Sequence, residues 1–223
     1  MQARYERNIP ALSEQECLLL RQKRVLVAGC GGLGGHIIEL LSRIGVGSIV
    51  AVDGDVFEET NLNRQLLSDV TRLGSSKAEA AKARVQLVNP DVRVQAVHAF
   101  ITEENAAGLI SGCDAVLDAL DNIPARRTLA RACAEGGIPY IYGAIRGWVA
   151  QAALSLPGDG LIERLYPESA AISDKSVLSF TPALCASMQA ALCARLLCGR
   201  SVESGKLYYF DLQDMEFETI PMA

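Results

Sequence analysis

A glycine-rich turn between an apolar strand and a helix constrains the fold more than any other stretch of this chain. Residues 24–30 form a largely apolar run, which is typical of a strand in a parallel sheet. Gly29, Gly31 and Gly34 lie at its end with the spacing G-x-G-x-x-G, and helical spacing of apolar residues extends over 33–44. A strand, a glycine turn and a helix in this order predict the first unit of a doubly wound α/β fold.

Strand-like and helix-like segments alternate along the rest of the chain. Further strands are predicted at 48–53, 92–99, 114–120, 139–145 and 148–156. Further helices are predicted at 77–88, 102–110, 122–135 and 181–198. This alternation predicts a Rossmann-like, doubly wound α/β sheet that is mostly parallel. Two last strands, at 207–212 and 216–220, predict an antiparallel C-terminal ending.

The 223 residues fit one α/β domain. Residues 1–23 are expected to form an N-terminal arm and a short helix, which begins at the capping box Ser13–Glu16. Residues 24–145 are expected to form the nucleotide-binding core. Residues 157–180 show no clear period and are expected to be a mobile crossover loop. The helix that follows this loop is expected to be capped by Thr181-Pro182.

Composition excludes several classes of function. The net charge of −5 argues against nucleic acid as the main partner, because phosphate binding needs a basic face. No apolar run reaches about 18 residues, so no membrane span is expected. The charged N-terminus has no secretory h-region, so we expect a cytoplasmic protein. The seven cysteines include no C-x-x-C pair and lie mostly among apolar residues, which predicts reduced, buried thiols.

The glycine turn also predicts a nucleotide site. Glycine permits a tight turn and close backbone approach to a phosphate, and Gly32 lies inside the same turn. The N-terminus of the following helix offers free N–H groups and partial positive charge. Asp53 ends the next strand, where its carboxylate can accept hydrogen bonds from ribose hydroxyls. These features leave open whether the nucleotide is NAD, FAD or ATP.

Several polar residues beyond the second strand do not belong to a plain dehydrogenase. They are Asp55, Asn61, Asn63, Arg64, Gln65, Lys77, Asp121 and Asn122. Asp121 follows the fourth strand at its carboxyl end, which is the ligand-facing edge of such sheets. Two cations for a polyphosphate and a carboxylate for Mg²⁺ suit attack on a nucleotide phosphorus, where positioning and charge neutralisation do most of the work.

This set of motifs resembles the MoeB/ThiF/HesA adenylyltransferases, which are bacterial relatives of ubiquitin-activating enzymes. The matching motifs are Arg-Tyr-x-Arg at 4–7, the glycine turn at 29–34, Asp-Gly-Asp at 53–55, Asn-Leu-Asn-Arg-Gln at 61–65, Gly-x-x-Lys at 74–77 and Asp-Asn at 121–122. The resemblance is strong over residues 1–145 and looser in the helix and strand pair that end the chain. It implies a single adenylation domain over residues 1–223.

The resemblance implies a reaction and its partners. The protein would be a homodimer that binds ATP and Mg²⁺. It would adenylate the C-terminal carboxylate of a ubiquitin-like sulfur-carrier protein of the ThiS/MoaD type, ending in Gly-Gly, and release pyrophosphate. A peptide carboxylate is already ionised at pH 7, so this step needs no general base. It needs alignment of the attacking carboxylate with the α-phosphate and neutralisation of the charge on the departing pyrophosphate.

The resemblance also implies roles for individual residues. Arg7, Arg64, Lys77 and Asp121 are the expected catalytic residues, with Arg7 reaching across the dimer as an arginine finger and Asp121 holding Mg²⁺. The expected nucleotide-binding residues are Gly29, Gly31, Gly32, Gly34, Asp53, Asp55, Asn61, Arg64, Gln65 and Lys77. Among them Asp53 would hold the ribose and Asp55 would lie near the reacting phosphate. Arg146 and Trp148, after the fifth strand, are candidates to line a channel for the carrier tail.

The chain departs from the family pattern in two places. Many relatives bind zinc through two C-x-x-C pairs. The place of the first pair, at 156–165, reads LPGDGLIERL, and the second pair is also absent, so no zinc is expected. Some relatives carry a cysteine in the crossover loop, but 172–180 reads ISDKSVLSF. The resemblance therefore implies adenylation without an enzyme–carrier thioester, after which the activated carrier passes to an external sulfur donor.

Three other functions are weighed against carrier adenylation. The first is activation of a carboxylate or carbamoyl group on tRNA or a small molecule, with the acidic charge counting against tRNA. The second is a non-catalytic module that binds ubiquitin-like proteins, which has no need of the complete polar set. The third is an NAD-dependent oxidoreductase, which leaves Arg64, Lys77 and Asp121 unexplained.

Overall fold

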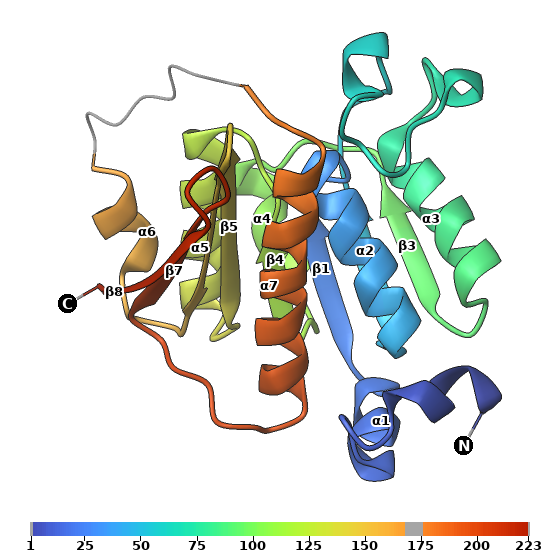
Figure 1. Ribbon diagram of the computed structural model, residues 1–223, viewed down its shortest axis with the longest axis horizontal. Coiled ribbons are helices and arrows are strands. Elements are labelled where there is room, and N and C mark those ends of the chain that lie inside the picture. The colour runs from blue at the N-terminus through green and yellow to red at the C-terminus, as the bar shows by residue number, and fades with distance from the viewer. Residues whose placement is uncertain (1, 168–175, 223) are drawn as a thin grey trace.

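A single mixed sheet of eight strands organises the molecule. The computed structural model describes residues 2–167 and 176–222 (Figure 1). The strand order is β3-β2-β1-β4-β5-β6-β7-β8. Strands β1 to β5 pair in parallel, whereas β6, β7 and β8 each pair antiparallel with their neighbours. The predicted Rossmann-like sheet with an antiparallel C-terminal ending is therefore confirmed.

The strands and helices follow the predicted segments closely. The strands are β1 (Arg24–Ala28), β2 (Ser48–Val52), β3 (Arg93–Val97), β4 (Ala115–Asp118), β5 (Tyr140–Arg146), β6 (Val149–Ser155), β7 (Lys206–Asp211) and β8 (Glu216–Pro221). The α-helices are α1 (Glu14–Leu20), α2 (Gly32–Ile44), α3 (Lys77–Val88), α4 (Glu103–Ile110), α5 (Ile123–Glu135), α6 (Leu161–Leu165) and α7 (Phe180–Leu197). Short 3-10 helices are η1 (Ala3–Asn8), η2 (Glu59–Asn61) and η3 (Val70–Arg72).

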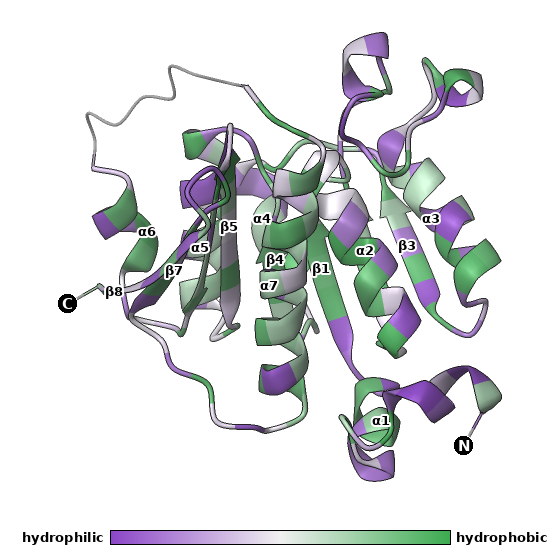
Figure 2. Cartoon of the chain, viewed as in Figure 1, coloured by the Kyte–Doolittle hydropathy of each residue, from purple (hydrophilic) through white to green (hydrophobic). Residues whose placement is uncertain are grey.

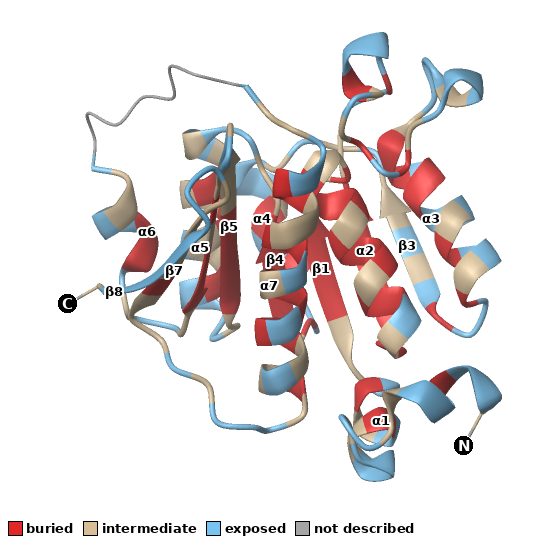
Figure 3. Ribbon diagram, in the orientation of Figure 1, coloured by how far each residue is buried: buried red, intermediate tan, exposed pale blue. Residues whose placement is uncertain are grey.

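Helices cover both faces of the sheet and enclose two apolar cores. Helices α2, α3 and α7 pack on one face, and α4, α5 and α6 pack on the other (Figure 1). Strands β1, β2 and β4 are buried and apolar, whereas β3 and β8 at the two edges are more exposed (Figures 2 and 3). Apolar runs without alternation are what a parallel strand needs when both of its faces are covered.

The order of the strands reverses beside β1. Strand β1 pairs with β2 on one side and with β4 on the other. The connections that follow β1 and β4 therefore leave the sheet in opposite directions, which opens a crevice beyond the carboxyl ends of these strands. Ligands of doubly wound folds bind in such crevices. The segment after β2 also begins at this edge, so three connections can contribute residues to one site.

Helix α7 is the longest helix among the described residues. It packs between α2 and the sheet strands β5 and β6. By length and composition it is the one helix in residues 2–167 and 176–222 that could cross a membrane, yet half of it is buried inside the protein. The expected cap at Thr181-Pro182 is wrong, because both residues lie inside the helix, and Ser179 holds the N-cap position. Thr181 is buried and donates its hydroxyl to the carbonyl of Gly147 instead.

The N-terminal segment is anchored to the body of the protein. The predicted N-terminal arm is not free in solvent, because η1 places Tyr5 in the interior at 2% exposure. Asn89 donates to the Tyr5 hydroxyl at 2.8 Å and accepts from Arg4 at 2.5 Å. Gly45 ends α2 with φ 92°, and a Cβ there would lie 2.7 Å from the Tyr5 ring. Burial of one aromatic side chain therefore orders a segment whose arginines remain in solvent.

The segment expected to be a crossover loop contains a short helix. Helix α6 forms because Leu161 and Ile162 bury their side chains in the core beneath α5. Residues 168–175, in the middle of the predicted loop, lie outside the described residues. All seven cysteines are free, and six of them are buried, as expected of reduced thiols.

Candidate active site

A cavity of about 1100 Å³ lies beyond the carboxyl ends of the parallel strands. Its lining comes from the β1–α2 turn, the segments after β2 and β3, the β4–α5 loop and the ends of β5, β6 and β7. Of the residues predicted for the site, the cavity is lined by Gly29, Gly31, Gly32, Asp53, Asp55, Arg64, Gln65, Lys77 and Asp121. The crevice at the strand reversal therefore gathers most of the predicted polar set.

Two glycines of the turn, Gly29 and Gly34, leave no room for a side chain. Gly29 has φ 94°, and a Cβ there would lie 2.6 Å from the carbonyl oxygen of Ala119. A Cβ on Gly34 would lie only 1.7 Å from the carbonyl oxygen of Gly29. Gly34 does not line the cavity, so its glycine serves the close packing of helix against turn. The result is a bare helix N-terminus that faces the cavity.

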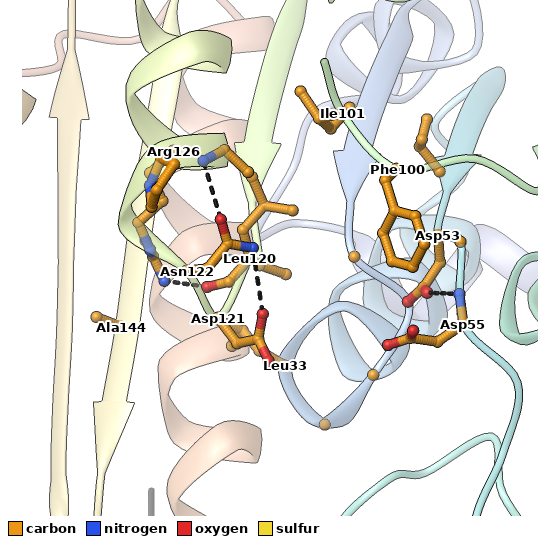
Figure 4. A pocket seen from close by; sticks show the side chains of 18 of the residues that line it. Leu33, Asp53, Asp55, Phe100, Ile101, Leu120, Asp121, Asn122, Arg126 and Ala144 are labelled. Carbon is orange, nitrogen blue, oxygen red and sulfur yellow. Dashed lines mark hydrogen bonds between the residues drawn. The ribbon is translucent and has the colours of Figure 1, made fainter. Parts of the chain in front are cut away.

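Asp53 joins the glycine turn to the segment after β2. One carboxylate oxygen accepts from the Cys30 N–H at 2.7 Å. The other accepts from the Asp55 N–H at 2.8 Å (Figure 4). Burial raises the pKa of Asp53, while these backbone hydrogen bonds oppose the rise. Each oxygen keeps a second lone pair, so the carboxylate can still accept from a ligand hydroxyl.

Lys77 is a buried cation of the site. It begins α3, where the helix dipole disfavours a positive charge. Its Nζ atom lies 3.2 Å from Asp55 Oδ2, and its backbone N–H donates to the Asp55 carbonyl at 3.1 Å. Lysine in such a position is explained better by an anion in the cavity than by the stability of the helix.

The 61–65 segment presents one cation and one amide to the glycine turn. Arg64 lies against Gly32, and its guanidinium donates to the Thr60 carbonyl at 2.9 Å. Gln65 is 6% exposed and contacts Gly31, and its Oε1 atom has no hydrogen-bond partner within the described part of the chain. A buried acceptor without a partner at the cavity wall suits a ligand donor.

The β4–α5 loop brings a carboxylate to the opposite wall. Asp121 is exposed and lines the cavity, and its side chain accepts a long 3.5 Å hydrogen bond from the Asn122 side chain. Asn122 caps α5 by accepting from the Ala125 N–H at 2.9 Å, as predicted. The Asp121 side chain is thus left available to a ligand, and Figure 4 shows it opposite Asp53 and Asp55.

The wall after β3 is apolar and was not predicted. Phe100 is 65% exposed, and its ring lies so close to Gly54 that a Cβ there would meet it at 2.8 Å. Ile101 also lines the cavity beside it, and Leu120 adds an apolar side chain from the β4–α5 loop (Figure 4). An apolar wall next to a ribose-type acceptor is suited to a flat base. The sequence did not reveal Phe100, because an exposed Phe in a loop has no distinctive pattern. Its place in the cavity wall depends on its tertiary contact with Gly54.

The cavity extends beyond the nucleotide end toward the antiparallel strands. Arg146, Gln151 and Tyr209 line this part, together with Val149 and Val177. Arg146 was predicted at this place, whereas Trp148 lies outside the cavity lining and packs against Phe180 with 5.2 Å between the ring centroids. The space therefore continues past the β4–α5 loop and can hold a second, extended molecule.

Besides Gly34 and Trp148, two more predicted residues do not reach the cavity of this chain. Asn61 is buried, and its side chain accepts from the Glu58 N–H at 3.1 Å, so it shapes the turn that carries Arg64. Arg7 lies in η1, near the amino end of β1, whereas the cavity lies at the carboxyl end (Figure 1). Within one copy Arg7 cannot contact a ligand in this cavity.

A buried ion pair at the cavity wall was missed from the sequence, and its arginine, Arg126, is one of the residues that line the cavity. Asp118 is 0% exposed and pairs with Arg126, which is 4% exposed. Tyr140 also donates its hydroxyl to Asp118. Burial raises the pKa of Asp118, and the Arg126 charge opposes the rise. The available signal was the acidic residue at 118 inside the apolar strand segment 114–120.

Known proteins resemble this chain in sequence and in fold. The model of the ThiF family matches residues 5–223. The SAMP-activating enzyme E1 of Haloferax volcanii is 38% identical over 91% of this chain and 77% of its own length. The sulfur carrier protein adenylyltransferase of Thermus thermophilus is 32% identical over 97% of this chain and 86% of its own. The crystal structure of E. coli MccB with ATP covers 100% of this chain and 72% of that one, with a TM-score of 0.86 and 20% identity, and so shares the fold.

Proposed function

Because this chain belongs to the ThiF family, we propose that it adenylates the C-terminal carboxylate of a ubiquitin-like sulfur-carrier protein and releases pyrophosphate. The observation that supports this best is the convergence of Arg64, Lys77 and Asp121 on one cavity from three separate segments. The names of the archaeal and thermophile relatives are consistent with this activity.

The nucleotide end of the cavity is suited to ATP. In our proposal the bare N-terminus of α2 meets the phosphates, and Asp53 accepts from the ribose. Arg64 and Lys77 supply positive charge to the phosphates, and the wall at Phe100 meets the base. The unpartnered Gln65 acceptor supports this assignment, since a ligand donor would satisfy it.

The side chains around Asp121 suit an open Mg²⁺ site better than a metal site closed by protein ligands alone. The described residues hold no group of three or more His, Cys, Asp or Glu side chains that could bind a metal by themselves. Mg²⁺ commonly takes only one or two carboxylates and fills its shell with waters and substrate phosphates. Asp121 would hold the ion, which would neutralise phosphate charge when bound.

The far end of the cavity is suited to the tail of the second substrate. Arg146 adds a positive charge to this end, and small residues such as Ala144 leave room for an extended Gly-Gly tail. The cavity then aligns the tail carboxylate with the α-phosphate, which is the main requirement of the reaction. This placement needs no cysteine, in agreement with the absence of one from the sequence at 172–180.

We further propose that the active form is a cytoplasmic homodimer in which Arg7 acts on the partner copy. Arg7 lies far from the cavity of its own chain, and its exposed side chain is carried by a well-anchored segment. A rigid base under an exposed arginine is what an arginine finger supplied to another subunit requires.

A test of the proposed function is ATP–pyrophosphate exchange with purified carrier proteins that end in Gly-Gly. We expect exchange that depends on the carrier, on Mg²⁺ and on Asp121, and that is lost in Asp121→Ala. The same assay with tRNA or small carboxylic acids in place of the carrier examines the alternative substrates. Carrier-independent exchange, or its persistence in Asp121→Ala, would overturn the proposal.

A further inference from the structure

Both backbone polar groups of Leu120, the residue before Asp121, are held by the buried ion pair. Asp118 Oδ1 accepts from the Leu120 N–H at 2.9 Å. The Nη2 group of Arg126 donates to the Leu120 carbonyl (Figure 4). On the other side of Asp121, the Asn122 side chain is tied to the first turn of α5. The backbone around Asp121 is therefore fixed, although the Asp121 side chain itself is exposed.

Burial of the Asp118–Arg126 ion pair, which holds Leu120, has a large free-energy cost. Moving a carboxylate and a guanidinium out of water costs several kcal/mol each, and a well-packed apolar pair is often at least as stable. Further contacts compensate part of that cost. Arg126 donates to the Gly143 carbonyl at 2.9 Å and lies 5.2 Å from the centroid of the Tyr142 ring. These contacts satisfy both Nη groups of Arg126, whereas its buried Nε atom has no hydrogen-bond partner within the described residues, and they do not explain why a charged pair is there.

The geometry of Arg126 matches two acceptors at once. Nη1 contacts Asp118 and Nη2 contacts the Leu120 carbonyl, so one rigid guanidinium connects the carboxylate to the backbone. The planar fork of arginine presents two nitrogens in fixed directions, whereas lysine has a single nitrogen on a flexible stem. Lysine could keep the charge balance with Asp118 but would not hold both acceptors in the same way.

We infer that Arg126, braced by Asp118, is a positioning residue that fixes Leu120 and so aims the Asp121 carboxylate into the cavity. The inference rests on the proposed function only for what Asp121 binds. Although Arg126 lines the cavity, in this role it acts through the backbone of Leu120 and not by contact with the nucleotide. Supports of this kind around a metal ligand typically contribute roughly 10–100-fold to metal affinity.

A first experiment measures the backbone directly and needs no ligand. Hydrogen exchange of peptides that cover 119–122 is compared in the wild type, Arg126→Lys and Arg127→Lys. Arg127 is the matched control, because it is the next residue of α5 and donates to the Tyr166 carbonyl at 2.5 Å instead. We expect faster exchange at 119–122 in Arg126→Lys alone, with β1 unchanged. Equal exchange in all three proteins would overturn the inference.

A second experiment measures the consequence for the metal. Calorimetric titration of ATP in EDTA and at increasing Mg²⁺ gives metal-free affinity and the half-saturating Mg²⁺ concentration. We expect Arg126→Lys to keep its affinity for ATP in EDTA and to need roughly 10–100-fold more Mg²⁺, and Arg127→Lys to match the wild type. Unchanged Mg²⁺ dependence in Arg126→Lys would contradict the positioning role.

The outcomes separate this inference from the proposed function. If the wild-type protein binds ATP without any effect of Mg²⁺, the metal role of Asp121 fails, while hydrogen exchange still decides the role of Arg126. If Arg126→Lys does not fold, the double variant Asp118→Asn/Arg126→Gln removes both buried charges together. We expect that variant to fold and to show the same loss of protection at 119–122, and wild-type protection there would overturn the inference.

Discussion

Lys77 and Asp55 form an ion pair with 3.2 Å between Nζ and Oδ2, and the two side chains differ sharply in exposure, at 9% for Lys77 and 55% for Asp55. The cation is held inside the protein while its partner remains largely in water. A ligand phosphate can therefore approach Lys77 from the cavity without breaking a buried pair. This relationship gives the site a fixed positive charge at the glycine turn.

Removal of the Lys77 ammonium should damage the chemistry more than the fold. We expect Lys77→Met to lower the rate of carrier-dependent exchange by roughly 10²–10³-fold, because preorganised charge at a reacting phosphate contributes about this much. Lys82→Met is the control, since Lys82 is exposed on the same helix. Thermal unfolding checks that both variants are folded. Wild-type exchange in Lys77→Met would remove this lysine from the site.

The glycine turn should not tolerate even one methyl group at Gly34. A Cβ there overlaps the carbonyl of Gly29, so we expect Gly34→Ala to lose about 1–3 kcal/mol of unfolding free energy. Its affinity for ATP should fall as well. Gly108→Ala is the matched control, because a Cβ at that helical position has nothing within 4 Å. The free energy of unfolding of the control should rise by about 0.5–1 kcal/mol, because alanine is the better helix former. Urea denaturation measures this free energy for both variants.

The arginine finger can be tested by mixing two inactive variants. If Arg7 acts on the partner, Arg7→Ala and Lys77→Ala should each lack exchange activity alone. Denatured together and refolded, they should recover part of it, because each heterodimer holds one site with both residues. A mixture of Lys77→Ala and Asp121→Ala should recover nothing, since both residues line the cavity of the same chain. Full activity of Arg7→Ala alone would refute the role.

The Glu16–Arg200 pair should make stability depend on pH in the acid range. The hydrogen bond from Arg200, together with that from the Ser13 backbone, lowers the pKa of Glu16 from 4.5 to about 2. A carboxyl group with a lowered pKa stabilises the folded state above its unfolded value and loses that effect as pH falls through the folded value. We therefore expect Arg200→Gln to unfold at a lower temperature than the wild type at pH 7, with the gap closing between pH 4.5 and 2. A gap that stays constant over this range would contradict the assignment.

The parts of the fold that could be predicted depend on neighbours in the sequence. The strand–turn–helix at 24–44 and the Ser13–Glu16 capping box were both predicted, because a few adjacent residues determine them. The cap of α7 was predicted wrongly. Thr181 has a partner in Gly147, which is 34 residues earlier, and no local pattern reveals such a contact.

The candidate site divides in the same way. The sequence by itself determined the glycine turn, the residue types at 61–65 and the acid at 121, because backbone conformation and phosphate chemistry restrict these positions locally. Only the tertiary structure decided that Asn61 and Arg7 lie away from the cavity, and that Asp118 and Arg126 brace Leu120. Those relations depend on strand order and on which side chains share the interior. Both arise from the packing of segments far apart in the chain, so no local pattern encodes them.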